Sequence, residues 1–494
     1  MNSRNRTFAL LFLVLLLYFL FRTINLTLLP IFNDESTYIR YGLHQLNEQN
    51  HQPYSLLIGK EPLMPYLYAV FGSASGNLLV GSRWVTILFG LLTLTGLFLF
   101  TKSLMGKTAA LFASIFYCIA PFTVFFDRLA LLDSPVSTIA VWSLYVTHQL
   151  LKKSLWWYAI GLGAITGIGM WMKTSDLFYL CLPLISYAIY FFAKGDKEFV
   201  KGRMFVTAFF LALIIYLPLF SNPFYSVHMQ LMQQYTYPIY SVFFFPFAVW
   251  WNNFASTFEW LFFYLTPPLF LLALVTLIII TKQKKFFLIS LWFYMPLLYE
   301  VLYAKLFASR HVLLLTIPLF IAAGYGFAYL WKKKWVWALV LGACIIAWTI
   351  FYDGVLVTNP QQYPSLFPGR AMGDMNEYVH GFSSGYGVAE AVTYLDQLAA
   401  TQRIVVLIRN DHGNPEDAMV AYFDYKPNIL LGPMNVPTAD VPQVFQQVGT
   451  TTPVYFVTRG SYNAGLEKYF ASEVKFNKPN DTEYVGVARL QPSK

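Results

Sequence analysis

The chain has 494 residues, of which 57% are hydrophobic, 19% aromatic and only 12% charged, with a formal net charge of +9. Soluble domains carry roughly 25% charged residues, so this composition excludes an ordinary soluble protein and indicates a membrane protein with no nucleic-acid partner. The three cysteines, Cys118, Cys181 and Cys344, all lie within apolar runs. Within such runs each most simply packs as a small hydrophobic residue, so we predict neither a disulfide framework nor a cysteine metal site.

Eleven apolar runs of membrane-crossing length follow one another along the chain and predict a polytopic helical bundle. The first run follows the short basic segment 2–6 and looks like a signal peptide. No small-residue cleavage site follows it and further runs do, so we interpret it as an uncleaved first helix. The predicted spans cover residues 7–29, 78–100, 107–126, 134–151, 155–172, 175–193, 203–220, 258–281, 285–305, 310–330 and 335–353.

The distribution of Lys and Arg predicts the orientation of this bundle. If the N-terminus is cytoplasmic, sixteen Lys and Arg before residue 354 fall on the cytoplasmic side and eight on the other. Cytoplasmic loops normally carry the excess, so we predict an integral protein of the plasma (inner) membrane with its N-terminus inside. Most acidic residues then lie at the outer rim, where polar chemistry is expected.

Two connections on the outer side are too long to be simple turns. Residues 30–77 contain two amphipathic helix-like pieces, 34–47, with Asn33 as its cap, and about 62–71, which we predict to lie at the membrane interface. Residues 221–257 are rich in Tyr and Trp. This aromatic density is typical of an interfacial belt, and a groove for a lipid is the alternative.

The composition changes after residue 353. Residues 354–494 contain ten Lys and Arg against thirteen Asp and Glu, in contrast to the basic membrane part. We therefore divide the chain into a transmembrane domain, 1–353, and an extracytoplasmic α/β domain, 354–494, because short strand-like and helix-like runs alternate in the second part. The predicted strands are 403–408, 428–431, 453–457 and 484–490, and the predicted helices are 387–398, 415–425, 441–448 and 464–470.

Two adjacent carboxylates, Asp34 and Glu35, directly follow the first span. They could simply stabilise a helix N-terminus. Their predicted neighbours favour catalysis on a lipid phosphate instead, because cations would hold the anionic group while a carboxylate takes a proton from an incoming nucleophile. Each cation alone is more often a helix-terminal or snorkelling residue. The charged residues predicted on this outer face are Lys60, Glu61, Arg83, Asp127, Arg128, Asp133, Lys173, Lys305, Arg310 and His311.

Four motifs in this order resemble a known family. They are Asp34-Glu35 after the first span, Lys60-Glu61-Pro62, Arg128 with Asp133, and the run from Lys305 through Arg310-His311 to Leu315 before Pro318. Together they are similar to the membrane glycosyltransferases of the C-type fold (GT-C), and in particular to bacterial and archaeal relatives of the dolichyl-phosphate-mannose-protein mannosyltransferases and of the aminoarabinose transferases that modify lipid A. The likeness covers about residues 7–330, and the outer α/β domain is consistent with it.

This resemblance implies a hexosyl- or pentosyltransferase of the cell envelope. Its donor would be a sugar on a polyprenyl phosphate, and its acceptor a lipid, a polysaccharide or a protein. The implied mechanism is direct attack with inversion. Asp34 would be the general base and Glu35 would help to shape the site. The implied contacts of the donor phosphate are Lys60, Arg83, Arg128, Lys173 and Arg310, while Asp133, Glu61 and His311 would contact the acceptor or orient other groups.

One departure from the family pattern concerns position 37. The lipid A transferases commonly have an Arg three positions after the Asp, whereas this chain has Thr37. Some relatives bind a divalent metal near the acidic residues, but a single further carboxylate, Glu61, is weak support for one. We therefore predict no cofactor and no metal requirement.

Two other classes of function remain as alternatives. A transporter or flippase of a lipid-linked sugar would line its path with similar charges. Transporters often show a repeat between their halves, and none is found here, while the charges gather at one rim. A receptor without catalytic activity would have no use for so many charged groups at membrane depth. The transferase is the interpretation that the sequence favours.

Overall fold

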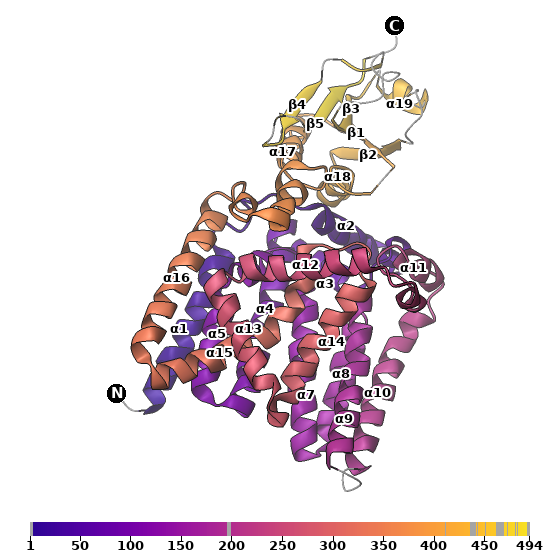
Figure 1. Cartoon of the computed structure of the whole chain (residues 1–494). Helices are drawn as coiled ribbons and strands as arrows, with labels where there is room; N and C mark the ends of the chain where they lie inside the picture. The colour runs from indigo at the N-terminus through magenta and orange to yellow at the C-terminus, as the bar shows by residue number, and fades with distance from the viewer. Residues whose placement is uncertain are drawn as a thin grey trace.

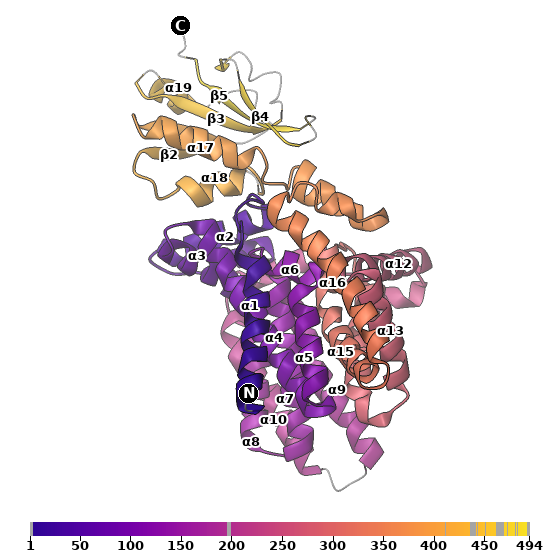
Figure 2. The ribbon, with the colours of Figure 1, turned by 90° about the vertical axis from the view of Figure 1, so that its left-hand side faces the viewer.

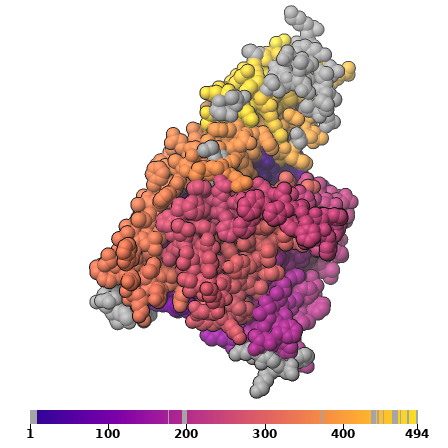
Figure 3. Space-filling model, in the orientation of Figure 1, coloured from indigo at the N-terminus to yellow at the C-terminus, as the bar shows by residue number. Residues whose placement is uncertain are grey.

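A bundle of long apolar helices carries a small α/β domain at one end (Figure 1). The computed structural model describes residues 3–194, 199–410, 412–434, 441, 443–449, 451–460, 469–471, 473–479, 481 and 483–491. The first helix begins at the end of the bundle remote from this domain, as two perpendicular views show (Figures 1 and 2). In the space-filling view the α/β domain rises from the bundle as a narrower lobe (Figure 3). We call it the outer domain.

An apolar helix lies at each predicted span. Among the described residues, five helices are both long and apolar enough to cross a membrane, or six if the pair α5 and α6 (Pro121–Asp127), bent by 61°, forms one span. The protein is therefore an integral membrane protein, while the number of eleven spans stays a prediction. The bundle helices are α1 (Ser3–Thr23), α4 (Leu78–Met105), α5 (Lys107–Ile119), α7 (Asp133–Lys153), α8 (Trp156–Gly169), α9 (Leu177–Lys194), α10 (Phe199–Phe220), α13 (Pro267–Thr281), α14 (Phe287–Tyr303), α15 (Thr316–Lys333) and α16 (Trp335–Thr358).

The span predicted over 258–281 is wrong as a single helix. The chain breaks at Thr266, whose φ is +70°, and Pro267 starts the next helix. Proline disfavours the helical conformation in the residue before it and donates no backbone hydrogen bond, so the helix cannot continue through this point. The residues before the break belong to α12 (Phe247–Tyr264), which lies across the bundle instead of along it (Figure 1).

Lysines mark the end of the bundle remote from the outer domain. Lys102 lies in the last turn of α4, and Lys152 and Lys153 lie in the last turn of α7. Lys332 and Lys333 end α15 in the same way. Cations at helix C-termini are favoured by the helix dipole, and their gathering at this end agrees with the predicted excess of basic residues on one side.

The rim next to the outer domain is built from short helices. The two helices predicted in the first outer loop are confirmed as α2 and α3. The second loop places aromatic side chains outward, since Phe243 and Phe244 are more than three-quarters exposed. This exposure favours the interfacial belt over a closed lipid groove for that stretch. The rim elements are α2 (Asn33–Asn47), η1 (Tyr54–Ile58), α3 (Leu63–Ala74), η2 (Thr174–Asp176), α11 (Tyr225–Met232), η4 (Ile239–Phe244), α12 and η6 (Ser309–Leu315), while η5 (Lys284–Phe286) joins α13 to α14.

The outer domain contains a five-stranded mixed sheet with the strand order β2-β1-β3-β5-β4. β1 pairs in parallel with β2 and β3, whereas β5 runs antiparallel to β3 and β4. β1 and β3 are apolar and buried along almost their whole length, as expected for central strands. The strands are β1 (Ile404–Arg409), β2 (Ile429–Met434), β3 (Val454–Arg459), β4 (Val474–Asn477) and β5 (Tyr484–Arg489), and the helices are α17 (Val388–Ala399), α18 (Glu416–Phe423) and α19 (Gln443–Val448).

The boundaries of this domain differ slightly from the prediction. α16 continues to Thr358, beyond the boundary at 353, and the short turns η7 (Pro364–Leu366), η8 (Gly369–Gly373) and η9 (Asn376–His380) then lead to the sheet. The edge strand β4 was not predicted, because its side chains are mostly exposed and give no apolar pattern. The helix predicted over 464–470 lies, apart from its last two residues, outside the described residues.

Candidate active site

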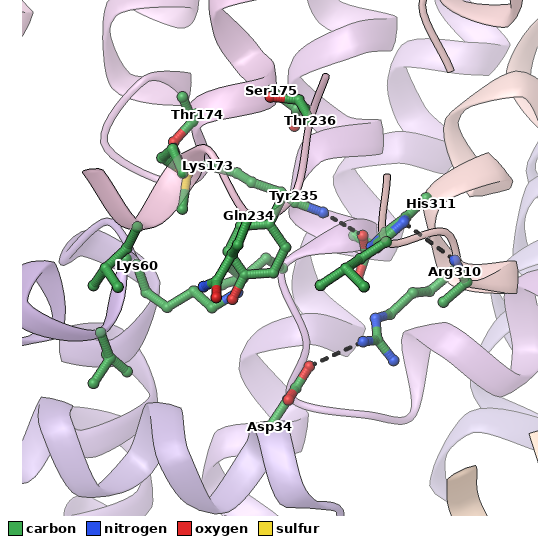
Figure 4. A pocket seen from close by; sticks show the side chains of 18 of the residues that line it. Asp34, Lys60, Lys173, Thr174, Ser175, Gln234, Tyr235, Thr236, Arg310 and His311 are labelled. Carbon is green, nitrogen blue, oxygen red and sulfur yellow. Dashed lines mark hydrogen bonds and ion pairs between the residues drawn. The ribbon is translucent and has the colours of Figure 1, made fainter. Parts of the chain in front are cut away.

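A cavity of about 810 Å³ lies at the rim, between the bundle and the outer domain. Residues from α2, from the loop before α3, from the start of η2 and from η6 line it, and the outer part of the chain adds Glu377, Phe382, His412 and Gly413. Seven of the ten residues predicted for the site line this cavity. They are Asp34, Lys60, Glu61, Asp133, Lys173, Arg310 and His311. Several of these side chains approach the same space from different elements (Figure 4).

Asp34 lies at the start of α2, and its side chain faces the cavity. The helix begins because Phe32 is extended and its N–H donates to Glu35 Oε2 at 2.9 Å. Asn33 is therefore not the cap that the sequence predicted. The carboxylate of Asp34 is about one-quarter exposed, and its Oδ2 lies 3.3 Å from Arg310 Nη2. A carboxylate in this position has room to accept a proton from a bound hydroxyl group.

Arg310 lies between two carboxylates. Besides Asp34 it forms an ion pair with Glu377, and its guanidinium lies 5.7 Å from the centre of the Phe32 ring. Two negative partners already balance its charge, so the geometry favours Arg310 as the group that holds Asp34. Its predicted contact with the donor phosphate would require one of these carboxylates to give way.

Lys60 is the cavity lysine best placed to bind an added anion. Its Nζ lies 4.5 Å from the centre of the Tyr235 ring, and within the described part of the chain it forms no ion pair with a carboxylate. Tyr235 is fixed in turn, because its carbonyl accepts a hydrogen bond from the backbone N–H of Lys305 at 2.9 Å. A lysine held over an aromatic face keeps its charge available for a phosphate.

Lys173 and Asp133 form an ion pair, with Nζ 2.6 Å from Oδ1. Of the two roles that the sequence suggests for Asp133, orienting Arg128 or contacting the acceptor, the first finds no support, because its ion-pair partner is Lys173. Glu61 accepts a hydrogen bond from Thr174 and lies 3.4 Å from the buried His228. His228, on α11, could not be recognised from the sequence, because it is a lone histidine in an aromatic loop.

Glu35 and Arg83 lie outside the cavity as a fully buried pair. Arg83 donates to both carboxylate oxygens of Glu35, at 2.8 and 2.6 Å, and also to the carbonyls of Leu26 and Leu29. Glu35 Oε1 further accepts the backbone N–H of Ala130 at 2.7 Å. This pair joins α2, α4 and the loop after α1. The predicted contact of Arg83 with the donor phosphate finds no support in this position.

Arg128 also lies away from the cavity. Its guanidinium donates to the carbonyls of Phe21, Ile24 and Asn25, at the C-terminal end of α1. A cation there satisfies carbonyl groups that have no partner within the helix. Arg128 therefore ends a helix, and its predicted role at the donor phosphate finds no support either.

Replacing Arg83 by Met should destabilise the protein strongly. Breaking a buried ion pair leaves an unpaired charge and typically costs about 3–5 kcal/mol. The measurement is the thermal unfolding of purified protein in detergent. Arg370 is the matched control, because its ion pair with Glu259 lies at the surface and Arg370→Met should cost less than about 1 kcal/mol. Equal stability of the two variants would contradict this role of Arg83.

Residues of the segment after α16 complete the cavity wall, and the sequence did not point to them. Asp374 accepts hydrogen bonds from Tyr264 and from Ser309 Oγ, the latter at 2.7 Å, and Glu377 pairs with Arg310. Burial, together with the nearby charge of Glu377, raises the pKa of Asp374 to about 7. Both acidic residues therefore fix the start of η6, which carries Arg310.

The part of the chain that the structure describes contains no cluster of three or more His, Cys, Asp and Glu that could hold a metal ion. The carboxylates of the cavity are instead paired with Arg310, Lys173, Thr174 and His228, apart from Glu300, whose backbone carbonyl accepts a hydrogen bond from Asn253. The cavity thus contains both a carboxylate that can accept a proton and cationic side chains that can bind an anion.

Comparisons with known proteins agree with the resemblance drawn from the motifs. Residues 59–221 match the family model described as dolichyl-phosphate-mannose-protein mannosyltransferase. No curated protein sequence matches the chain significantly. The fold is similar to that of ArnT from Cupriavidus metallidurans, solved bound to undecaprenyl phosphate, with a TM-score of 0.65 and 14% identity over 99% of this chain and 98% of that one.

An archaeal structure shares the fold as well. The oligosaccharyltransferase from Archaeoglobus fulgidus in its apo form superposes with a TM-score of 0.54 and 11% identity, over 99% of this chain and 74% of that one. These similarities confirm the predicted architecture, a C-type-fold helical membrane domain followed by an outer α/β domain.

Proposed function

We propose that this chain, which has the fold of the C-type membrane glycosyltransferases, transfers a sugar from a polyprenyl-phosphate donor to an acceptor on the outer side of the membrane. The observation that carries the proposal is the shared cavity of Asp34 and Lys60 at the rim. A carboxylate that can take a proton and a lysine that can hold a phosphate are the two groups that such a transfer needs most. The sugar is a hexose or pentose, and the acceptor a lipid, a polysaccharide or a protein.

The proposed reaction is a direct displacement with inversion. An acceptor hydroxyl attacks the anomeric carbon of the sugar while Asp34 takes its proton. The bond between that carbon and the phosphate oxygen breaks, and the polyprenyl phosphate leaves with the electron pair. Lys60 stabilises the negative charge of the leaving group. Positioning and electrostatic stabilisation would supply most of the rate, because phosphate is already a good leaving group.

Two further observations support this proposal. ArnT from Cupriavidus metallidurans, which shares the fold, was solved with undecaprenyl phosphate, a lipid of the proposed donor class. The lysine-rich ends of α4, α7 and α15 lie opposite the cavity, which supports a cytoplasmic N-terminus and an extracytoplasmic site in the plasma membrane.

The experiment that tests the function uses the purified full-length protein in nanodiscs. It is incubated with radiolabelled polyprenyl-phosphate sugars and with membrane extracts that contain acceptors. We expect release of free polyprenyl phosphate and movement of the label to an acceptor. A transporter, flippase or receptor would release no free carrier, so intact donor after incubation with every sugar would refute the proposal. Nanodiscs without protein provide the blank.

We further propose that the transfer needs no divalent metal. Exhaustive treatment of the purified protein with EDTA should leave turnover of the donor unchanged within about twofold, because cationic side chains neutralise the leaving group. The same treatment followed by addition of Mg²⁺, Mn²⁺ or Zn²⁺ is the control. A large loss on chelation that one of these ions restores would contradict the proposal.

A further inference from the structure

We infer that the outer domain positions the catalytic base, and that Asp417 is the residue through which it does so. The inference rests on the proposed function of Asp34. α18 of the outer domain lies against α2, which carries Asp34 near its start (Figure 2). Asp417 of α18 contacts α2 after Asp34, and Asn414, just before α18, contacts residues on each side of Asp34.

Asp417 is a buried carboxylate whose two oxygens both bind α2. Oδ1 forms an ion pair with Arg40, and Oδ2 accepts a hydrogen bond from Thr37 Oγ1 at 2.6 Å. Oδ2 also accepts the backbone N–H of Gly413 at 2.8 Å. Thr37 stands three positions after Asp34 and therefore on the same face of the helix. Asp417 thus fixes both the rotation of α2 about its axis and the position along that axis of the helical turn after Asp34.

Asn414 fixes the residues immediately around the base. Its backbone N–H donates to Asn33 Oδ1 at 2.7 Å, and its side-chain amide donates to the carbonyl of Ile31 at 3.0 Å. Its side-chain oxygen accepts the hydroxyl of Ser36 at 2.8 Å. The chain before and after Asp34 is therefore held by one short segment of the outer domain.

Gly413 allows this close approach. Its φ is +102°, and a Cβ atom there would lie 2.3 Å from Asn33 Oδ1. Only glycine adopts such a conformation without strain while leaving room for the Asn33 side chain. Residues 413, 414 and 417 together form what we call the outer clasp, and the rest of the outer domain supports it.

The outer clasp acts on the base and not on the phosphate end of the cavity. Lys60 contacts Tyr235, and none of the contacts of the outer clasp reaches either residue. Loosening the clasp should therefore disturb the position of Asp34 while donor binding is kept. Small displacements of a catalytic group can cost about 100-fold in rate, so the effect belongs in kcat.

The test compares Asp417→Asn with Asp424→Asn in full-length protein in nanodiscs. Asp424 is an exposed carboxylate at the end of the same helix and provides the matched control. We expect Asp417→Asn to lower kcat at least about tenfold per folded molecule with the KM for the donor unchanged within twofold, and the control to match the wild type. Thr37→Ser should keep most of the activity, because it keeps the hydroxyl that Asp417 accepts. A wild-type kcat for Asp417→Asn, or a loss confined to KM, would overturn the inference.

A second measurement does not depend on turnover. Hydrogen exchange of residues 33–47 should be faster in Asp417→Asn than in the wild type or the Asp424→Asn control. Unchanged exchange in that helix would also overturn the inference. If the wild type released no carrier phosphate from any donor, the proposed function would fail, whereas the exchange data would still decide whether Asp417 holds α2.

Discussion

Asp34→Asn should lower the turnover of the donor by about 10²- to 10⁴-fold, the range expected for the loss of a general base. The amide has nearly the same shape as the carboxylate but cannot take the proton of an acceptor hydroxyl. The variant should remain folded, because Arg310 keeps its ion pair with Glu377. Donor binding should stay largely intact, since Lys60 is untouched. The measurement is the release of free polyprenyl phosphate at saturating donor, together with donor binding to the same sample.

Glu48→Gln is the matched control for this variant. Glu48 stands at the C-terminal end of the same helix, is exposed, and contacts only His44 among the ion pairs of the described residues. Its change from carboxylate to amide should leave turnover near the wild-type value. Near-normal turnover of Asp34→Asn would show that another group is the base, whereas equal losses in both variants would indicate a general effect on α2.

Lys60→Met should weaken donor binding by roughly 10- to 100-fold, because a hydrogen bond to a charged group contributes about 1.5–3 kcal/mol. Turnover should fall as well, since the leaving phosphate loses its cation in the transition state. Methionine keeps the apolar stem against Tyr235, and the change leaves no carboxylate without a partner. The measurement is the dissociation constant for polyprenyl phosphate and the kcat of transfer on the same preparation.

Lys305→Met provides the control for Lys60. Lys305 is also a rim lysine near a tyrosine, with Nζ 6.0 Å from the Tyr237 ring, but it does not line the cavity. We expect its loss to change carrier binding less than twofold. If Lys60→Met bound the carrier as tightly as the wild type, the phosphate would have to be held elsewhere, and Lys173 would be the next candidate.

The sequence predicted which end of the bundle holds the site, but not which of its charged residues face the cavity. Asp34 and Glu35 are neighbours in sequence, yet successive residues of a helix point about 100° apart. Asp34 therefore faces the cavity while Glu35 faces inward to Arg83. Topology alone assigned Arg83 and Arg128 to the correct rim. Topology could not show that the guanidinium groups of Arg83 and Arg128 already donate to nearby backbone carbonyls.

Hydropathy predicted the helices well, because a segment that crosses the hydrocarbon core must be apolar and must satisfy its backbone hydrogen bonds as a helix. It failed at Thr266, where apolar residues continue on both sides of a break in the backbone. The contact between the segment around α18 and α2 could not be recognised from any pattern in the sequence. It depends on individual partners such as Asn414 and Asp417, which in the sequence look like ordinary loop and helix-start residues. Thr37, the departure from the family pattern, is used in this contact.

The outer clasp also determines how early during synthesis the site can be complete. α2 leaves the ribosome early, whereas residues 413–417 are made after the whole bundle. A nascent chain that has inserted all its apolar helices therefore still lacks the partners of Asn33, Ser36 and Thr37. At an elongation rate of about 5–20 residues per second, several further seconds pass before the last strand of the sheet is complete. The proposed transfer would thus begin only after the C-terminal part is made, so a prematurely terminated chain would occupy the membrane without activity.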